Sequence, residues 1–170
     1  MSKAEEDYRI WKNDNFIVEA TIDMSLWNKK IIKDFQENLS KVLTEIYKKS
    51  DIIFSNSKKS ISLSFSGDKR IIELNYFYRK LSSATNVLSF PSHSKSKNTT
   101  FLGDIIFANE TICEEAKRDN KSMNNHLTHL FIHGVLHLLG YDHETNEKAE
   151  KMESLEIEIL SALKIDNPYK

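Results

Sequence analysis

The sequence contains few of the residues on which several classes of protein depend: among 170 residues there are one cysteine, two prolines and four glycines. A single thiol, Cys113, excludes an intrachain disulfide framework and a metal site with two cysteine ligands. No apolar run approaches the roughly 18 residues of a membrane-spanning helix, and the charged N-terminus lacks the apolar segment of a secretory signal. We therefore expect a soluble, cytoplasmic protein with no membrane partner.

An excess of charge of one sign is also missing, because 24 basic residues oppose 25 acidic ones. The total charge therefore does not indicate a nucleic-acid partner. The distribution is less even: residues 58–98 contain eight basic and two acidic residues, a net charge of +6, whereas residues 142–170 contain four basic and eight acidic residues, a net charge of −4. The basic middle is compatible with a groove for an anionic polymer, but charge alone favours an ordinary solvated surface.

The length of the chain and its 39% of hydrophobic residues allow one substantial core, so we expect a single domain over residues 1–170. Residues 1–14 are polar and charged, and we expect them to form a partly ordered extension of this domain. No internal repeat or linker interrupts the remainder.

The spacing of apolar residues predicts the secondary structure. Stretches rich in β-branched and aromatic residues indicate strands at 16–22, 60–66, 86–90 and 101–107. Helical spacing predicts helices at 25–47, 67–79, 109–120, 122–139 and 145–163. Pro91 should stop the third strand, and the polar residues 92–100 should form a mobile loop. The fold class is therefore α+β, with a single mixed sheet of about four strands packed with five or six helices.

Three histidines follow one another at a spacing that suits one metal ion. His133 and His137 are four residues apart, so they lie on the same face of a helix. Gly140 can take the left-handed conformation that ends a helix, which lets the chain turn back and bring His143 to the same centre. Three protein ligands with one open position are typical of hydrolytic zinc sites, so we expect one zinc ion at this buried helix and the turn after it.

The surrounding residues decide between a metal site and incidental helix histidines. Residues 130–139 are apolar on nearly every side, which indicates a buried helix. Buried imidazoles need partners for their ring nitrogens, and one ion supplies a partner to both. His129 lies about 12 Å along the axis from His137, too far to share an ion with His133 and His137 together. We interpret His129 and His126 as groups outside the ligand set or on the surface.

The spacing H-x-x-x-H-x-x-G-x-x-H is also that of the metzincin zinc proteases, in which a glutamate general base follows the first histidine. This chain has Gly134 there, so a peptidase would lack its base. The whole run from His133 to His143, HGVLHLLGYDH, resembles the signature of the YbeY family of metal-dependent ribosomal RNA maturation endoribonucleases. The segments 78–91 and 102–105 resemble further blocks of that family.

The resemblance implies a catalytic role for Arg79, which precedes the segment TNVLSFP and whose planar guanidinium suits phosphate oxygens. The alternative for Arg79 is an ordinary surface position at a helix end. Asp104 and Asp142 are candidates to orient a ligand histidine through its second ring nitrogen. Asp104 could equally cap the following helix.

The function that the resemblance implies is a single-strand-specific, metal-dependent endoribonuclease in the maturation of the 16S ribosomal RNA 3′ end and in ribosome quality control. Its partners would be RNA and the small ribosomal subunit, with no DNA, and we expect a monomer or a weak oligomer. The residues alone leave two alternatives open. One is a zinc metallopeptidase, and the other is a non-catalytic ribosome-binding module in which the metal is structural.

Overall fold

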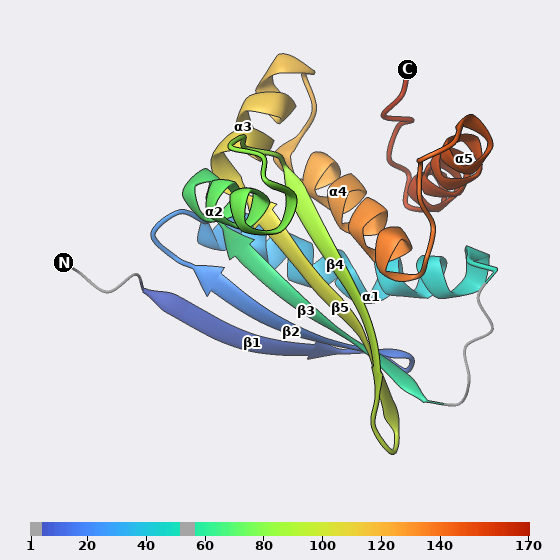
Figure 1. The fold of residues 1–170 in the computed structure, drawn as a ribbon. Helices are drawn as coiled ribbons and strands as arrows, with labels where there is room; N and C mark the ends of the chain where they lie inside the picture. Colours follow the sequence, from blue (N-terminus) through green and yellow to red (C-terminus); the bar gives the residue numbers. More distant parts are fainter. Residues whose placement is uncertain (1–4, 52–56) are drawn as a thin grey trace.

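A computed structural model describes residues 5–51 and 57–170 (Figure 1). Within those ranges the chain forms five strands and five helices. The strands are β1 (Glu6–Lys12), β2 (Phe16–Asp23), β3 (Lys58–Ser66), β4 (Val87–Lys95) and β5 (Thr99–Ala108). The helices are α1 (Lys29–Lys49), α2 (Asp68–Arg79), α3 (Asn109–Arg118), α4 (Met123–Leu138) and α5 (Asn146–Ala162).

The five strands form one mixed sheet in the order β1-β2-β3-β5-β4. Strands β2, β3 and β5 run parallel, and the two edge strands β1 and β4 pair antiparallel with their neighbours. The predicted α+β class with a mixed sheet is therefore confirmed, and the five helices agree with the predicted five or six. The described part of the sheet has one strand more than the expected four, and that strand is β1.

Strand β1 corrects the expectation that residues 1–14 are a partly ordered extension, of which residues 1–4 lie outside the described ranges. Residues 6–12 pair with β2 along their whole length. Tyr8 and Ile10 are exposed, and only Trp11 reaches the core, where its ring meets Phe35 and Phe65. An edge strand held by backbone hydrogen bonds and one anchor lacks the apolar alternation by which a strand is predicted.

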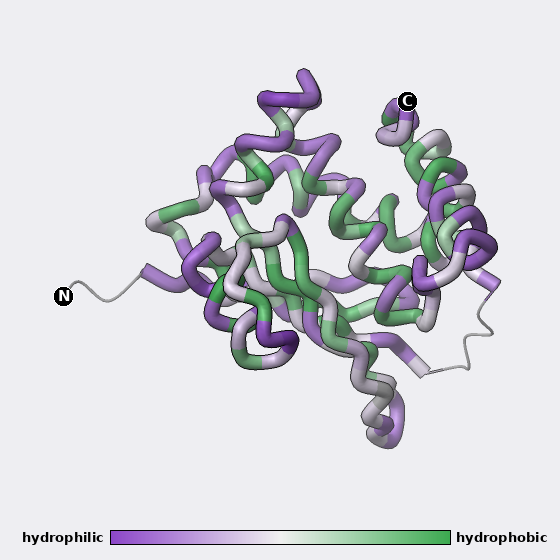
Figure 2. The backbone as a smooth tube through the Cα atoms, turned by 45° about the horizontal axis from the view of Figure 1, so that its top comes forward, coloured by the Kyte–Doolittle hydropathy of each residue, from purple (hydrophilic) through white to green (hydrophobic). Residues whose placement is uncertain are grey.

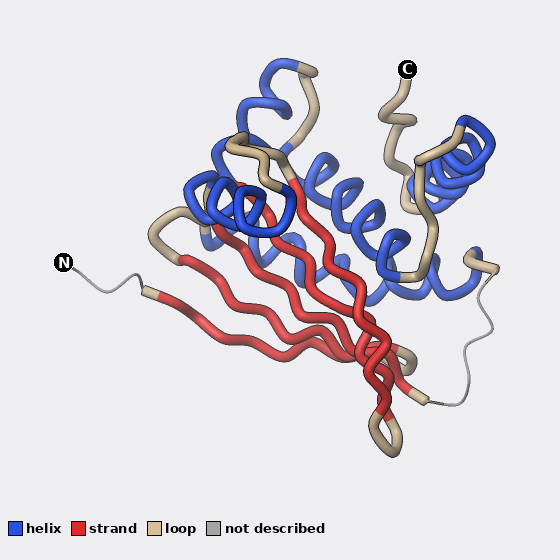
Figure 3. Tube along the Cα trace, viewed as in Figure 1, coloured by secondary structure: helices blue, strands red, loops and turns tan. Residues whose placement is uncertain are grey.

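The helices cover the sheet unequally (Figures 1 and 3). One face packs against α1 and α4, and aromatic rings join the layers: Phe65 on β3 and Phe131 on α4 each lie 5.4 Å from Phe35 on α1. The opposite face carries α2, whose Ile71 packs with Leu88 of β4. In Figure 2 the hydrophobic segments gather on the central strands and on α4, so α4 is the buried helix that its composition predicts.

Strands β4 and β5 form a hairpin where the sequence suggested a loop. Strand β4 continues through Pro91 to Lys95, and β5 begins at Thr99, so only 96–98 connect them. The expected mobile loop at 92–100 is therefore wrong. Proline is tolerated because β4 is an edge strand and the register shifts between Pro91 and Ser94, as in a β-bulge.

No helix in the described part of the chain is long and apolar enough to cross a bilayer.

Candidate metal centre

Helix α4 has a defined beginning and end. Ser122 caps its N-terminus, because its Oγ accepts a hydrogen bond of 3.1 Å from the Asn125 N–H. After its C-terminus Gly140 has φ +98°, the left-handed conformation predicted from sequence. The Gly140 N–H donates to the His137 carbonyl, and the chain turns back. A Cβ at position 140 would meet nothing within 4 Å, so glycine is needed here for its backbone conformation.

The turn brings the three predicted histidines together. Ring nitrogens of His133, His137 and His143 all lie within 4.8 Å of one another. The Nε2 atoms of His133 and His137 are 3.0 Å apart, and the His143 ring stands 5.0 Å from that of His137. His143 is exposed, whereas the other two are half-buried. The three histidines therefore lie at the C-terminal end of the buried helix α4 and in the turn after it, on a side that is open to solvent.

The second nitrogen of each helix histidine is already engaged. His133 Nδ1 is 2.6 Å from Glu156 Oε1, and His137 Nδ1 is 3.0 Å from the Tyr141 carbonyl oxygen. Both partners are acceptors, so Nδ1 carries the proton and donates in each ring. With the proton on Nδ1 of each neutral ring, the two Nε2 atoms, 3.0 Å apart, both offer a lone pair that one cation can accept.

This donor set fits a zinc ion. Nitrogen ligands stand about 2.0–2.1 Å from zinc, which separates two of them on a tetrahedron by about 3.3 Å. The observed 3.0 Å between the Nε2 atoms is close to that value. Burial, together with the neighbouring rings of His133 and His143, lowers the pKa of His137 to about 4, so this imidazole is neutral at pH 7 as a metal ligand must be.

Glu156 on α5 is the partner that sequence reasoning missed. Its side chain has no exposed surface, and both carboxylate oxygens are occupied, Oε1 by His133 and Oε2 by the Tyr169 hydroxyl at 2.5 Å. Burial alone would raise the pKa of Glu156, but His129, His133 and Tyr169 lower it to about 2. One signal was present in the sequence. Glu156 occupies the apolar face of α5 between Met152 and Ile159, where a carboxylate needs a buried partner.

His129 and His126 differ in their relation to this site. His129 Nε2 stands 3.6 Å from Glu156 Oε1 and 3.5 Å from the Tyr169 hydroxyl, so it borders the carboxylate and not the ligand nitrogens. His126 is buried and lies 2.7 Å from Glu115 Oε2 on α3.

Burial of Tyr169 and its contact with Glu156 raise the pKa of the tyrosine, which keeps it a donor at neutral pH.

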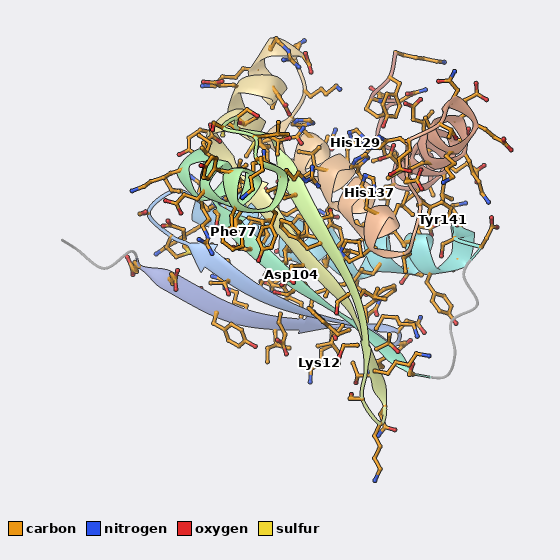
Figure 4. All side chains as sticks on the ribbon, viewed as in Figure 1. Lys12, Phe77, Asp104, His129, His137 and Tyr141 are labelled. Carbon is orange, nitrogen blue, oxygen red and sulfur yellow. The ribbon has the colours of Figure 1, made fainter. Side chains whose placement is uncertain are left out.

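The two aspartates that were candidates to orient a ligand lie elsewhere. Asp142 accepts from the Glu144 N–H and pairs with Lys148 at 3.1 Å, and the backbone carbonyl of Tyr141 serves His137 instead. Asp104 lines a hollow on the α2 face of the sheet, beside Tyr78 and Phe90. Figure 4 shows Asp104 on the strands and His137 on α4.

Arg79 is the last residue of α2 and is exposed. Within the described ranges no hydrogen bond or ion pair holds its guanidinium. Residues 80–86 then lead from α2 to the edge strand β4. The structure does not bring Arg79 into contact with the three histidines, so its role in catalysis stays a prediction.

Gly134, next to His133, explains how α4 lies so close to the sheet. A Cβ at this position would stand 3.1 Å from Ile105 Cδ1 and 3.2 Å from Ser89 Oγ. There is no room for the glutamate that metzincin proteases carry at this position.

Comparison with known proteins agrees with this geometry. The family described as Endoribonuclease YbeY matches residues 21–164. The Endoribonuclease YbeY of Bartonella quintana is 41% identical over 156 residues, covering 89% of this chain and 96% of that protein. The protein of the same name from Agrobacterium fabrum is 41% identical over 163 residues, covering 89% and 94%. The chain belongs to the YbeY family.

The segment that matches the YbeY family contains all three histidines and Glu156, whereas strand β1 and Tyr169 lie outside it. A solution structure of TM1509 from Thermotoga maritima is also similar, with a TM-score of 0.50 and 23% identity, covering 90% of this chain and 99% of that one. At that identity the likeness concerns the fold alone. In this YbeY-family member, strand β1 pairs with β2 and Tyr169 contacts Glu156, both outside the segment that the family model matches.

Proposed function

We propose that this chain is a metal-dependent endoribonuclease that cleaves single-stranded RNA, in the maturation of the 16S ribosomal RNA 3′ end and in ribosome quality control. Membership of the YbeY family supports the activity, because the relatives from Bartonella quintana and Agrobacterium fabrum are both named endoribonucleases. The observation that carries the metal dependence is the pair of Nε2 lone pairs 3.0 Å apart, each fixed by an acceptor on its own Nδ1.

His133, His137 and His143 would hold one zinc ion. When bound, the ion would act as a Lewis acid and activate a water molecule at neutral pH. The protein's own contribution is orientation: Glu156 holds the His133 ring, and the Tyr141 carbonyl holds the His137 ring, so that both Nε2 atoms point outward to one centre. Arg79 would bind the phosphate of the substrate through paired guanidinium donors.

The two alternatives are less well supported. A peptidase needs a general base after the first histidine, and Gly134 is packed against Ile105 and Ser89 with no space for one. A structural zinc site usually has four protein ligands. In the described part of the chain only three candidate ligands converge, and His143 leaves the site open to solvent.

The remaining parts of the proposal concern the domain organisation, the partners, the location and the oligomeric state. One large core joins strands β1, β2, β3 and β5 to helices α1, α4 and α5, which supports a single domain over residues 1–170. Ribosomal RNA and the small ribosomal subunit would be the partners, the cytoplasm the location, and a monomer or weak oligomer the working form.

The test is a set of parallel cleavage assays with the purified chain. We expect cleavage of a single-stranded RNA, no cleavage of the matched duplex or of casein, loss of activity with a chelator and recovery on adding zinc. The His137→Ala variant should lose bound metal, because two ligands would be left at a site built for three. Cleavage of casein would favour the peptidase, and bound metal without turnover on any RNA would favour the structural module.

A further inference from the structure

Helix α2 exposes aromatic side chains that no other part of the described structure covers. Tyr76, Phe77 and Tyr78 are 60%, 68% and 62% exposed. The Phe77 and Tyr78 rings are 4.8 Å apart, and the Tyr78 ring is 5.0 Å from Phe90 on β4. Phe77, Tyr78 and Phe90 therefore form a continuous aromatic row. Monomeric proteins seldom expose large apolar side chains side by side without a function.

The aromatic row begins on β4, a strand against which helix α4 packs. Successive residues of a strand face opposite sides of the sheet. Ser89 faces α4, where its Oγ lies 3.2 Å from the position of a Cβ on Gly134, the neighbour of His133. Phe90 therefore faces α2, on the other side. Strand β4 is the edge of the sheet, so the α4 face and the α2 face meet along it (Figure 1).

Positive charge accompanies the aromatic rings. Four basic residues lie on α2 or directly after it: Lys69, Arg70, Arg79 and Lys80. Lys80 Nζ stands 5.8 Å from the centre of the Tyr76 ring. Of the two acidic residues on the helix, Asp68 accepts hydrogen bonds from Thr111 on α3, and Glu73 pairs with Arg70 at 3.6 Å, so Lys69, Arg79 and Lys80 leave a net positive charge. Exposed aromatic rings among cations are the combination by which proteins bind single-stranded nucleic acid without sequence preference.

Next to the row is a hollow of ≈ 380 Å³ on the α2 face. Tyr78 and Phe90 form one side of it, and Arg70 and Asp104 supply polar groups. A hollow with aromatic walls and both a donor and an acceptor suits a nucleobase better than a phosphate, which the Asp104 carboxylate would repel.

We propose that the aromatic row binds bases of the single-stranded RNA substrate by stacking, on the face of the sheet opposite the histidines. This inference rests on the proposed function and specifies how the substrate is held. The RNA would be cut at the α4 face, pass around the edge of β4, and stack its bases on Phe90, Tyr78 and Phe77. Stacking accepts every base, so the row would add affinity and length dependence without sequence preference.

The test measures binding separately from cleavage. Fluorescence anisotropy would compare a single-stranded RNA of about 16 nucleotides, the upper end of the usual site size, with a strand of equal length and charge that has abasic positions throughout. Phe77→Ala and Tyr78→Ala should each weaken binding of the base-bearing strand by about tenfold and leave the abasic strand unchanged. In cleavage assays KM should rise while kcat stays the same. Phe77→Trp should keep full affinity, because indole also stacks.

Tyr8→Ala is the matched control, because Tyr8 is an aromatic residue 58% exposed on β1, the opposite edge of the sheet. It should bind both strands like the unchanged protein. Equal affinity of the Phe77→Ala and unchanged proteins for the base-bearing strand would overturn the proposal. The proposal would also be overturned if Phe77→Ala and Tyr78→Ala lost self-association but kept their affinity for RNA. The row would then be a contact between two copies of the chain. If the protein binds RNA through the row but cleaves none, the proposed function fails and the stacking surface stands.

Discussion

Glu156 is a carboxylate without exposed surface, and its two oxygens join His133 on α4 to Tyr169 near the C-terminus. We expect Glu156→Gln to weaken zinc binding by about 10- to 100-fold, the usual effect of losing the partner that orients a ligand histidine. Competition with a chromophoric chelator would measure it. Glu158→Gln, an exposed position on the same helix, is the control and should bind zinc normally. Equal affinities in the two variants would show that His133 is oriented without Glu156.

Arg79 is exposed and has no ion pair or hydrogen bond within the described residues, so its removal should not affect folding. If it binds the substrate phosphate, Arg79→Ala should lose about 10²- to 10³-fold in turnover, the scale for one donor to developing charge. Zinc content and Tm should stay unchanged. Arg79→Lys should recover little, because an ammonium does not reproduce paired planar donors.

Arg118→Ala provides the comparison for Arg79, since it removes an exposed arginine from α3 whose ion-pair partner in the described part of the chain is its neighbour Asp119. Its turnover should match that of the unchanged protein. An Arg79→Ala protein with full turnover would remove Arg79 from the reaction, and one with a lowered Tm would assign it a structural role.

At the scale of elements, α4 lies against the sheet because Gly134 has no side chain. Gly134→Glu would force carbon into space held by Ile105 and Ser89, 3.1 and 3.2 Å away, and would bury a charge without a partner. We expect a loss of at least about 3 kcal/mol in the free energy of unfolding, measured by urea denaturation. No peptidase activity should appear. A stable Gly134→Glu protein that cleaves casein would contradict both the packing and the substrate class.

Elements whose sequence repeats with a helical or alternating period were predictable, and those without such a period were not. Helix α4 and the Gly140 turn follow from local sequence, because helical periodicity and turn chemistry act over a few residues. Strand β1 and the second half of β4 do not follow from local sequence. Edge strands carry polar residues at exposed positions, and they depend on backbone pairing with another strand. The first helix was predicted to start at residue 25, but its N-cap is Asn28, three residues later.

The residues of the metal centre also divide into those that the local sequence predicted and those that it did not. Three histidines within eleven residues were predictable from their spacing. Glu156 and Tyr169 were not, because only the packing of α5 and the C-terminal segment against α4 brings them to His133 and His129. The sequence also suggested aspartates, Asp104 and Asp142, as partners. Proximity in sequence favoured Asp142, but its carboxylate is directed to Lys148.

At the scale of the whole molecule, two histidines, His126 and the proposed ligand His137, make folding sensitive to acid, because the pKa of each is lowered in the folded protein. His126 Nε2 faces Glu115 on α3, and His126 Nδ1 is buried without a hydrogen-bond partner among the described residues. Burial lowers the pKa of His126 below its ordinary 6.5, despite the contact with Glu115. His129 and Lys121 lie close enough to lower the pKa of His126 further. As pH falls below 6.5 the unfolded chain therefore binds a proton that the folded protein does not, and the free energy of unfolding decreases.

We therefore expect stability to be fully present above pH 6.5 and to decline as the pH is lowered to 5, measured by urea denaturation with chelator present. His126→Gln should show a shallower decline, because its amide can donate to Glu115 yet does not titrate. At pH 8 the two proteins should agree within about 1 kcal/mol. Parallel declines over this range would show that other groups set the acid sensitivity.

The short span of the three histidines has a consequence for how zinc affects folding. The three proposed ligands lie within eleven residues and stay near one another when the rest of the chain is unfolded, so a newly made or denatured chain would also bind zinc, though more weakly. Added metal then stabilises the native state only by the difference between the two affinities. Glu156, which reaches His133 only after α5 packs against α4, supplies much of that difference. Zinc should therefore raise Tm by less than its affinity for the folded protein would suggest, and by least in the Glu156→Gln variant.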